Sequence, residues 1–131
     1  VKSLVQHKGL EIKKSPIHGY GVFTTQDIPN LTLIEECHLI LFHNNDALRY
    51  NDINLIRNGF GWPKLQNSSH IAIPFGYGCI YNSSDDPNIN WKTNEEKFLL
   101  EFYTIRDIKK GEELCHYYGN LIEFCRKNNI L

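Results

Sequence analysis

The sequence lacks a long apolar segment, closely spaced cysteines and an excess of positive charge. No apolar run approaches the roughly 18 residues that a membrane-spanning helix needs, so we expect no membrane span. The four cysteines are Cys37, Cys79, Cys115 and Cys125, and no two of them show C-x-x-C spacing. This pattern argues against a zinc cluster and favours reduced thiols in an intracellular compartment, while a disulfide pair stays open.

The charges are balanced, because 14 lysine and arginine residues stand against 15 aspartate and glutamate residues, for a net charge of −1. Without a global positive field, we expect neither nucleic acid nor a membrane as a direct partner. A length of 131 residues predicts one domain. The hydrophobic content of 41% and aromatic content of 12% suffice for a packed core.

What the sequence does contain is a series of short β-prone segments separated by turn signals. We expect strands at residues 10–14, 22–25, 70–74, 90–93 and 101–108, and one strand or two at 31–42, where Glu35 and Glu36 interrupt the pattern. Short helices are expected at 47–58 and 121–128. No repeat of fixed period is visible. The pattern indicates a mainly β (α+β) domain.

The first of three notable motifs is Gly19-Tyr20-Gly21. Glycine lets the backbone approach a ligand closely and adopt positive φ, so the motif suits a cofactor turn as well as an ordinary turn between strands. It does not suit a dinucleotide-binding loop. The third glycine of G-x-G-x-x-G is missing, and the residues that follow are β-prone rather than helical.

The second motif is the segment 82–88, Asn-Ser-Ser-Asp-Asp-Pro-Asn, and the third is 111–119, Gly-Glu-Glu-Leu-Cys-His-Tyr-Tyr-Gly. Taken alone, the second reads as a polar surface loop. In the third, Glu112 and Glu113 suit a solvated turn, and Tyr117 and Tyr118 suit buried core aromatics. Each motif is weak evidence by itself, whereas their order and spacing within one small domain are specific.

Together the three motifs resemble the SET-domain protein lysine methyltransferases, above all the minimal viral and microbial members. The resemblance implies a single SET domain over 1–131, with a core at about 10–124. The implied fold is a β-clip of several small sheets with a C-terminal pseudoknot and short helices. Larger relatives close the lysine channel with a zinc-bound cysteine segment after the core, but only Cys125 follows Gly119 here. We therefore expect no such segment and no metal. A homodimer, as in the small viral relatives, is one way to complete the site.

The resemblance also implies S-adenosylmethionine as the cofactor. It assigns cofactor contacts to Gly19, Tyr20, Gly21, Asn82, Ser83, Tyr118 and Phe124. Ser83 stands where the family usually has histidine, and serine cannot supply an imidazole, so the backbone would have to make the essential contact there. Phe124 suits stacking on the adenine and docking of a terminal helix equally well.

Tyr118 stands at the position of the family's catalytic tyrosine. Methyl transfer from a sulfonium to an amine is a direct displacement that depends on alignment, and a phenol oxygen stabilises the methyl group through weak C–H···O contacts. The attacking lysine must be neutral. At pH 7 this costs about 4.6 kcal/mol for a pKa near 10.4, and an apolar channel lowers that pKa. The substrate-binding residues expected to line such a channel are Phe60, Trp62, His116 and Tyr117.

The expected function is therefore an S-adenosylmethionine-dependent protein lysine N-methyltransferase. Its expected partner is a lysine-containing protein or peptide, with a histone tail as one candidate and the nucleus as the location. His116 stands where many members have a Phe or Tyr that helps to decide how many methyl groups are added, so the product is left open. Ser83 and His116 also motivate an alternative, a SET-like module that binds peptide or cofactor without catalysis. A β-rich structural domain with chance motif matches is a third reading.

Overall fold

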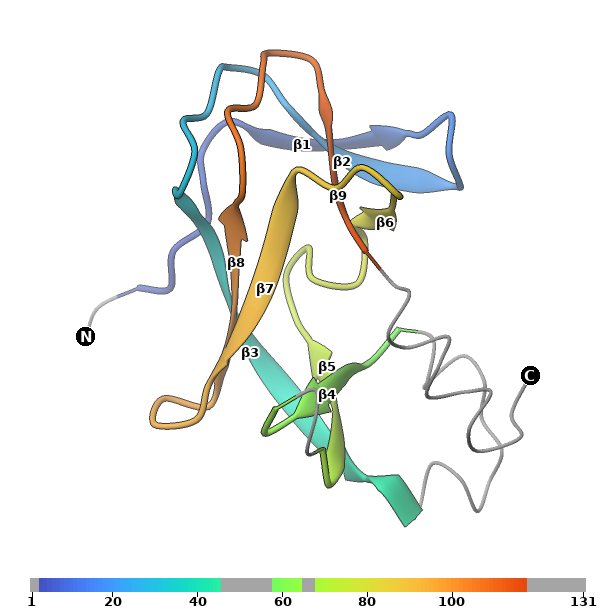
Figure 1. Ribbon diagram of the computed structural model, residues 1–131, viewed down its shortest axis with the longest axis vertical. Coiled ribbons are helices and arrows are strands. Elements are labelled where there is room, and N and C mark those ends of the chain that lie inside the picture. Colours follow the sequence, from blue (N-terminus) through green and yellow to red (C-terminus); the bar gives the residue numbers. More distant parts are fainter. Residues whose placement is uncertain (1–2, 46–57, 65–67, 118–131) are drawn as a thin grey trace.

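The computed structural model describes residues 3–45, 58–64 and 68–117, and these residues form nine β-strands in two sheets (Figure 1). The strands are β1 Leu10–Lys14, β2 Tyr20–Thr24, β3 Leu33–His43, β4 Phe60–Trp62, β5 His70–Pro74, β6 Asn82–Ser83, β7 Ile89–Asn94, β8 Leu99–Thr104 and β9 Glu113–His116. The sheet orders are β1-β2-β9-β6 and β4-β5-β3-β8-β7. The mainly β prediction is confirmed. The helices expected at 47–58 and 121–128 fall outside the described residues, apart from residue 58, which lies in a turn.

Strand β3 is the central strand of the larger sheet. Its first half pairs with β8 and its second half pairs with β5, so the two hairpins lie against different parts of one long strand (Figure 1). The interruption expected at Glu35 and Glu36 is a register shift between Leu33 and Glu35, and the strand continues through it. The strand expected at 101–108 is wrong at its end, because β8 stops at Thr104 and the chain bends there.

The short strands β4 and β6 were missed from the sequence, and so was β9, whose first residue was expected in a turn. Phe60 lies between two glycines just after the helix expected at 47–58, a pattern typical of a break between elements, but residues 60–62 pair with β5. Asn82 and Ser83 read as loop residues, yet they pair in parallel with Cys115 and His116 of β9. Strands β4 and β6 are very short, and only their pairing partners, which are distant in sequence, make them strands.

Two turns with the same sequence pattern hydrogen-bond to each other, and this contact places β9 beside β2. The pattern Thr-x-x-Asp-Ile occurs before both turns, with Asp27 and Ile28 in one and Asp107 and Ile108 in the other. The backbones of Ile28 and Ile108 exchange two hydrogen bonds of 2.8 Å. Each aspartate accepts a hydrogen bond of 2.8 Å from a backbone N–H of the opposite turn. The start of β9 is therefore fixed by contacts outside the sheet that it joins.

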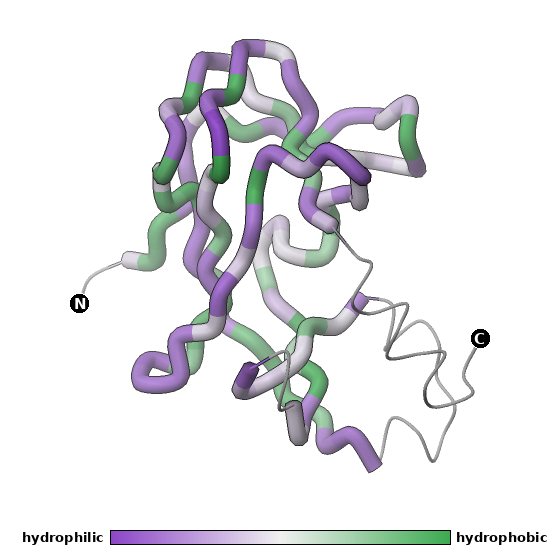
Figure 2. The backbone as a smooth tube through the Cα atoms, in the orientation of Figure 1, coloured by the Kyte–Doolittle hydropathy of each residue, from purple (hydrophilic) through white to green (hydrophobic). Residues whose placement is uncertain are grey.

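The core gathers the apolar side chains of both sheets, while the tip of the β7–β8 hairpin is hydrophilic (Figure 2). Its buried members include Val22, Ile28, Ile34, Phe60, Tyr81, Ile89, Leu100, Phe102, Ile108 and Leu114. Along β8 the side chains of Leu100, Phe102 and Thr104 are fully buried, which is the alternation expected of a strand with one face on the core. No helix among the described residues is long and apolar enough to cross a membrane.

A buried carboxylate ties strand β3 to the segment that leads into β6. Glu35 is only 2% exposed, and it accepts hydrogen bonds from Tyr81 Oη at 2.6 Å, Tyr77 N at 2.9 Å and Gln6 Nε2 at 3.1 Å. Gly76 passes directly over this carboxylate with φ of +73°, and a Cβ there would collide with Glu35 Oε2. Because Tyr81 immediately precedes Asn82, this network sets the position of the second motif.

Candidate active site

The first motif forms the turn between β1 and β2. Gly19 has φ of +49° and nothing near the position of a Cβ, so glycine is needed there for its backbone conformation. Tyr20 begins β2 and is 61% exposed. Gly21 is needed for space, since a Cβ there would collide with the Glu113 carboxylate and lie 3.0 Å from Asn82 Nδ2. Gly21 therefore leaves room for the Glu113 carboxylate and the Asn82 amide to lie against the turn.

The amide of Asn82 joins all three motifs. Its Nδ2 donates to the carbonyl oxygens of His18 at 3.0 Å and Tyr20 at 3.2 Å, and to Glu113 Oε2 at 2.7 Å. All three neighbours are acceptors, so only the NH₂ group can face them, and the orientation of the amide is fixed without ambiguity. The amide oxygen of Asn82 points away from this set, and it accepts no hydrogen bond from the described residues.

Asn88, at the end of the second motif, fastens the loop to β9. Its Nδ2 donates to Glu113 O at 2.8 Å, and its Oδ1 accepts from Cys115 N at 2.9 Å. The backbone N–H of Asn88 also donates to Cys115 O at 3.1 Å. Asn88 is 3% exposed. The buried Asn88 therefore supplies hydrogen bonds to the β9 backbone that a neighbouring strand would otherwise supply.

Glu113 is the site residue that the sequence reading missed. Besides the bond from Asn82, its Oε1 accepts a hydrogen bond of 2.7 Å from Ser15 Oγ. Composition and periodicity gave no sign of this, because a glutamate beside a turn is most often solvated. Only the pairing of β9 with β2 carries Glu113 beneath Gly21.

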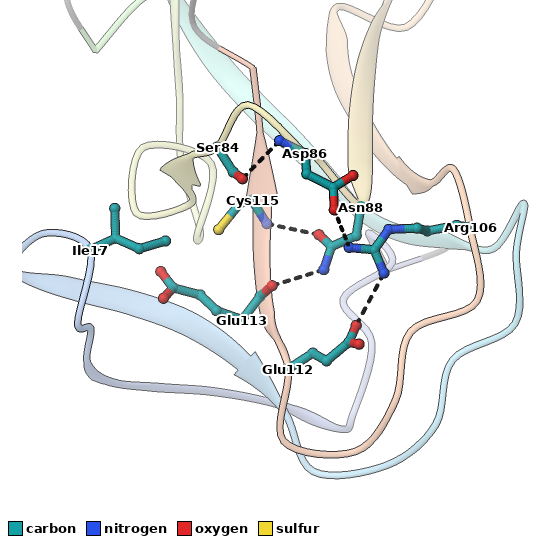
Figure 3. Close-up of a pocket in the computed structure, with 8 residues that line it drawn as sticks. All are labelled: Ile17, Ser84, Asp86, Asn88, Arg106, Glu112, Glu113 and Cys115. Atoms are coloured by element: carbon teal, nitrogen blue, oxygen red, sulfur yellow. Dashed lines mark hydrogen bonds and ion pairs between the residues drawn. The ribbon is translucent and has the colours of Figure 1, made fainter.

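A pocket of about 230 Å³ lies beside this cluster (Figure 3). Figure 3 shows the side chains of Glu113 and Cys115 on the side of β9 that faces Ile17. Burial, helped by the charge of Glu113, raises the pKa of the Cys115 thiol to about 12, so this cysteine stays protonated at neutral pH. At the outer rim the half-exposed Arg106 pairs with Glu112 at 3.6 Å, a contact worth little in stability.

The residues expected to bind substrate fall into two groups. Phe60 and His116 stack with ring centroids 5.4 Å apart, and Phe102 lies edge-on to both. Trp62 is buried as well, but it stacks against Phe98 at the tip of the β7–β8 hairpin, 5.8 Å away. Tyr117 is 53% exposed. Tyr118 and Phe124 lie outside the described residues.

Comparison with known proteins decides the family. The sequence model of the SET domain matches residues 19–119. The chain belongs to the SET-domain family. The SET domain described here is therefore a protein lysine N-methyltransferase, and S-adenosylmethionine is its methyl donor. The β-clip architecture expected from the resemblance is confirmed with it.

Three similar proteins are instructive. Over 115 residues the chain is 30% identical to a Schizosaccharomyces pombe protein named histone-lysine N-methyltransferase, H3 lysine-37 specific, covering 88% of this chain and 76% of that protein. A Plasmodium falciparum protein described as a histone methyltransferase has a crystal structure with a TM-score of 0.69 and 27% identity, covering 86% of this chain and 95% of that one. The autoinhibited ctPRC2 structure, bound to S-adenosylmethionine, gives a TM-score of 0.70 and 25% identity over 94% of this chain and 17% of that one.

His116 is expected to make this SET domain less stable in acid. Burial lowers the pKa of His116 to about 3, whereas an unfolded histidine has a pKa near 6.5. The unfolded state therefore takes up a proton between these values and the folded state does not. The contribution of neutral His116 to the free energy of unfolding is fully present above about pH 6.5 and decreases as the pH falls toward 3. At pH 5 the loss is about 2 kcal/mol, at 1.36 kcal/mol per pH unit.

Urea unfolding at pH 7 and at pH 5 measures this slope in the wild type and in His116→Phe. The phenylalanine keeps a ring against Phe60 and removes the titrating group, so the pH dependence should shrink by most of that amount. His38→Gln is the matched control, because His38 is exposed. Equal slopes in the wild type and His116→Phe would show that His116 does not stay neutral in the fold.

Proposed function

We propose that this SET domain methylates a lysine in a histone tail, with the cofactor held at the junction of the three motifs. One observation carries the cofactor site: the Asn82 amide hydrogen-bonds the glycine turn on one side and β9 on the other. The histone substrate is supported by the S. pombe relative, whose name assigns it to lysine 37 of histone H3. A histone substrate would place the protein's action in the nucleus.

The residues at the junction fit the methionine end of S-adenosylmethionine. The open space at Gly19 permits close approach of a ligand to the backbone, and the amide oxygen of Asn82 offers an acceptor for the ammonium group. The Glu113 carboxylate adds negative charge near a ligand that carries a sulfonium. We assign cofactor binding to Gly19, Tyr20, Gly21, Asn82 and Ser83, and to Tyr118 and Phe124 beyond the described residues.

When bound, S-adenosylmethionine supplies an electrophilic methyl group. The chain must then present a neutral lysine and hold it in line. The stacked rings of Phe60 and His116 offer an apolar wall, and apolar surroundings disfavour the charged form of the lysine, which favours loss of its proton to water. Trp62 and Tyr117 complete the proposed substrate-binding residues. The phenol of Tyr118 is the proposed catalytic group, through weak contacts with the transferred methyl.

We further propose that residues 1–131 form a single SET domain and that two chains pair to complete the site. Exposed apolar side chains on the β1–β2 hairpin, Ile12, Ile17 and Tyr20, support pairing, since they lie next to the proposed cofactor residues. Light scattering distinguishes a dimer from the 15.3 kDa monomer. A role in chromatin regulation would follow from the histone substrate.

Tyr118→Phe tests the proposed chemistry. Loss of the oxygen removes one or two weak contacts to the transferred methyl, and at about 0.5–1 kcal/mol each the rate of methyl transfer should fall roughly tenfold. The measurement is transfer of a tritiated methyl group to histone H3 in single-turnover experiments. Tyr103→Phe is the control, because Tyr103 lies in β8 beside Lys92 and outside the proposed site.

Three results would contradict parts of the proposal. Cofactor binding without transfer to any histone would indicate the non-catalytic SET-like module. Transfer to other proteins but not to histones would retain the methyltransferase and reject the histone substrate. An unchanged rate in Tyr118→Phe would remove Tyr118 from the catalytic role.

A further inference from the structure

Glu113 is a charged side chain whose two oxygens are both committed inside the site. Oε2 accepts from Asn82 Nδ2 and Oε1 accepts from Ser15 Oγ, each at 2.7 Å. Ser15 Oγ itself accepts from the backbone N–H of Ile17 at 3.0 Å, in the turn before Gly19. The carboxylate thus joins the turn between β1 and β2 to Asn82. No lysine, arginine or histidine among the described residues forms an ion pair with it.

We propose that Glu113 is a positioning residue that orients the Asn82 amide so that its oxygen faces the amino-acid end of the cofactor. The proposal rests on the cofactor site proposed above. A free asparagine amide can present either its oxygen or its NH₂ group to a ligand, and the two ends have opposite hydrogen-bonding character. The cofactor ammonium is a donor, so it needs the oxygen.

The carboxylate contributes more to this orientation than the two backbone carbonyls do. The Glu113 contact is the shortest of the three that Asn82 makes, at 2.7 Å against 3.0 and 3.2 Å. A hydrogen bond to an ionised acceptor is roughly twice as strong as one between neutral groups. The bond from Ser15 holds the carboxylate in one rotamer, and Gly21 leaves the room that this rotamer occupies.

Three probes separate an effect at the amino-acid end from a general loss of structure. S-adenosylmethionine and S-adenosylhomocysteine both carry the ammonium, and 5′-methylthioadenosine keeps the nucleoside and sulfur without it. Measured by calorimetry, Glu113→Ala should bind S-adenosylmethionine and S-adenosylhomocysteine about tenfold more weakly than the wild type. Tenfold is the scale of one charge-assisted hydrogen bond. Binding of 5′-methylthioadenosine should not change.

Glu113→Gln should restore the affinity to within about threefold of the wild type. Its amide oxygen can accept from Asn82 while its NH₂ group donates to Ser15 Oγ, so the orientation is kept without the charge. Glu96→Ala is the matched control, because it also removes one carboxylate but lies exposed in the turn of the β7–β8 hairpin, outside the pocket. It should bind all three probes as the wild type does.

Other outcomes reject the inference. Equal weakening of all three probes in Glu113→Ala would mean that Glu113 supports the fold of β9, and no weakening would mean that Asn82 is oriented without it. If Glu113→Ala does not fold, Ser15→Ala is used. It frees one carboxylate oxygen and should weaken only the two ammonium-bearing probes. A wild-type chain that binds none of the probes would overturn the proposed cofactor site itself, and this inference with it.

Discussion

Replacing Glu35 with alanine is expected to lower the free energy of unfolding by about 3–5 kcal/mol. The substitution removes the hydrogen bonds that Glu35 accepts from the Tyr81 hydroxyl and from the N–H of Tyr77, and a hydrogen bond to a charged group contributes about 1.5–3 kcal/mol. Total stability for a domain of this size is about 5–15 kcal/mol. The melting temperature should therefore fall by more than about 10 °C, measured by circular dichroism.

Two milder variants identify the cause. Tyr81→Phe keeps the ring and removes one donor to the buried carboxylate, so it should cost about 1.5–3 kcal/mol, the scale of a hydrogen bond to a charged group. Burial, helped by the charge of Glu35, raises the pKa of Tyr81 well above its ordinary value, so the phenol is protonated and can donate at neutral pH. The loss of stability in Glu35→Gln should lie between the losses in Tyr81→Phe and Glu35→Ala. The glutamine amide oxygen can still accept hydrogen bonds from Tyr77 N and Gln6 Nε2. A loss below about 1 kcal/mol in Glu35→Ala would contradict the network.

The same network explains a limit of sequence reading. The β-prone segments and turns predicted most strands to within a few residues, because alternation and turn residues act locally. Glu35 read as an interruption of a strand, since a carboxylate is not expected among buried side chains. Its partners lie 29, 42 and 46 residues away in sequence, and no local pattern records them. The hydrogen bonds between the Asp27 and Asp107 turns likewise join residues far apart in sequence, so no local pattern predicts them.

The cofactor site was predicted from three sequence motifs, and the structure shows the hydrogen bonds that connect these motifs. Gly21 and Asn82 were predicted as cofactor residues from the resemblance, and the structure brings both into contact with one carboxylate, Glu113. The resemblance assigned no role to Glu113, although this residue lies within the third motif, because its contacts arise from the pairing of β9 with β2. The roles of Tyr118 and Phe124 stay predictions, since both residues lie outside the described part of the chain.

Asn82→Asp is expected to weaken S-adenosylmethionine binding by at least roughly 100-fold at pH 8. The aspartate puts an acceptor where the NH₂ group donated, so an ionised oxygen would face two carbonyls and the Glu113 carboxylate. Like charges at hydrogen-bonding distance repel strongly in a partly buried site. The side chain must turn away, and the oxygen that faces the cofactor leaves its position. Calorimetry against the wild type measures the loss.

The pH dependence of this variant separates repulsion from simple loss of a side chain. The neighbouring carboxylate disfavours the charged form, so it raises the pKa of an aspartate at position 82. Once protonated, that aspartate can donate to Glu113 Oε2 as the asparagine did, and affinity should recover in part between pH 8 and pH 5.5. Asn90→Asp makes the same chemical change at an exposed position in β7 and should bind normally at both values. Wild-type affinity of Asn82→Asp at pH 8 would show that the amide does not join the motifs as described. A loss that is independent of pH would show that Glu113 is not what the new carboxylate opposes.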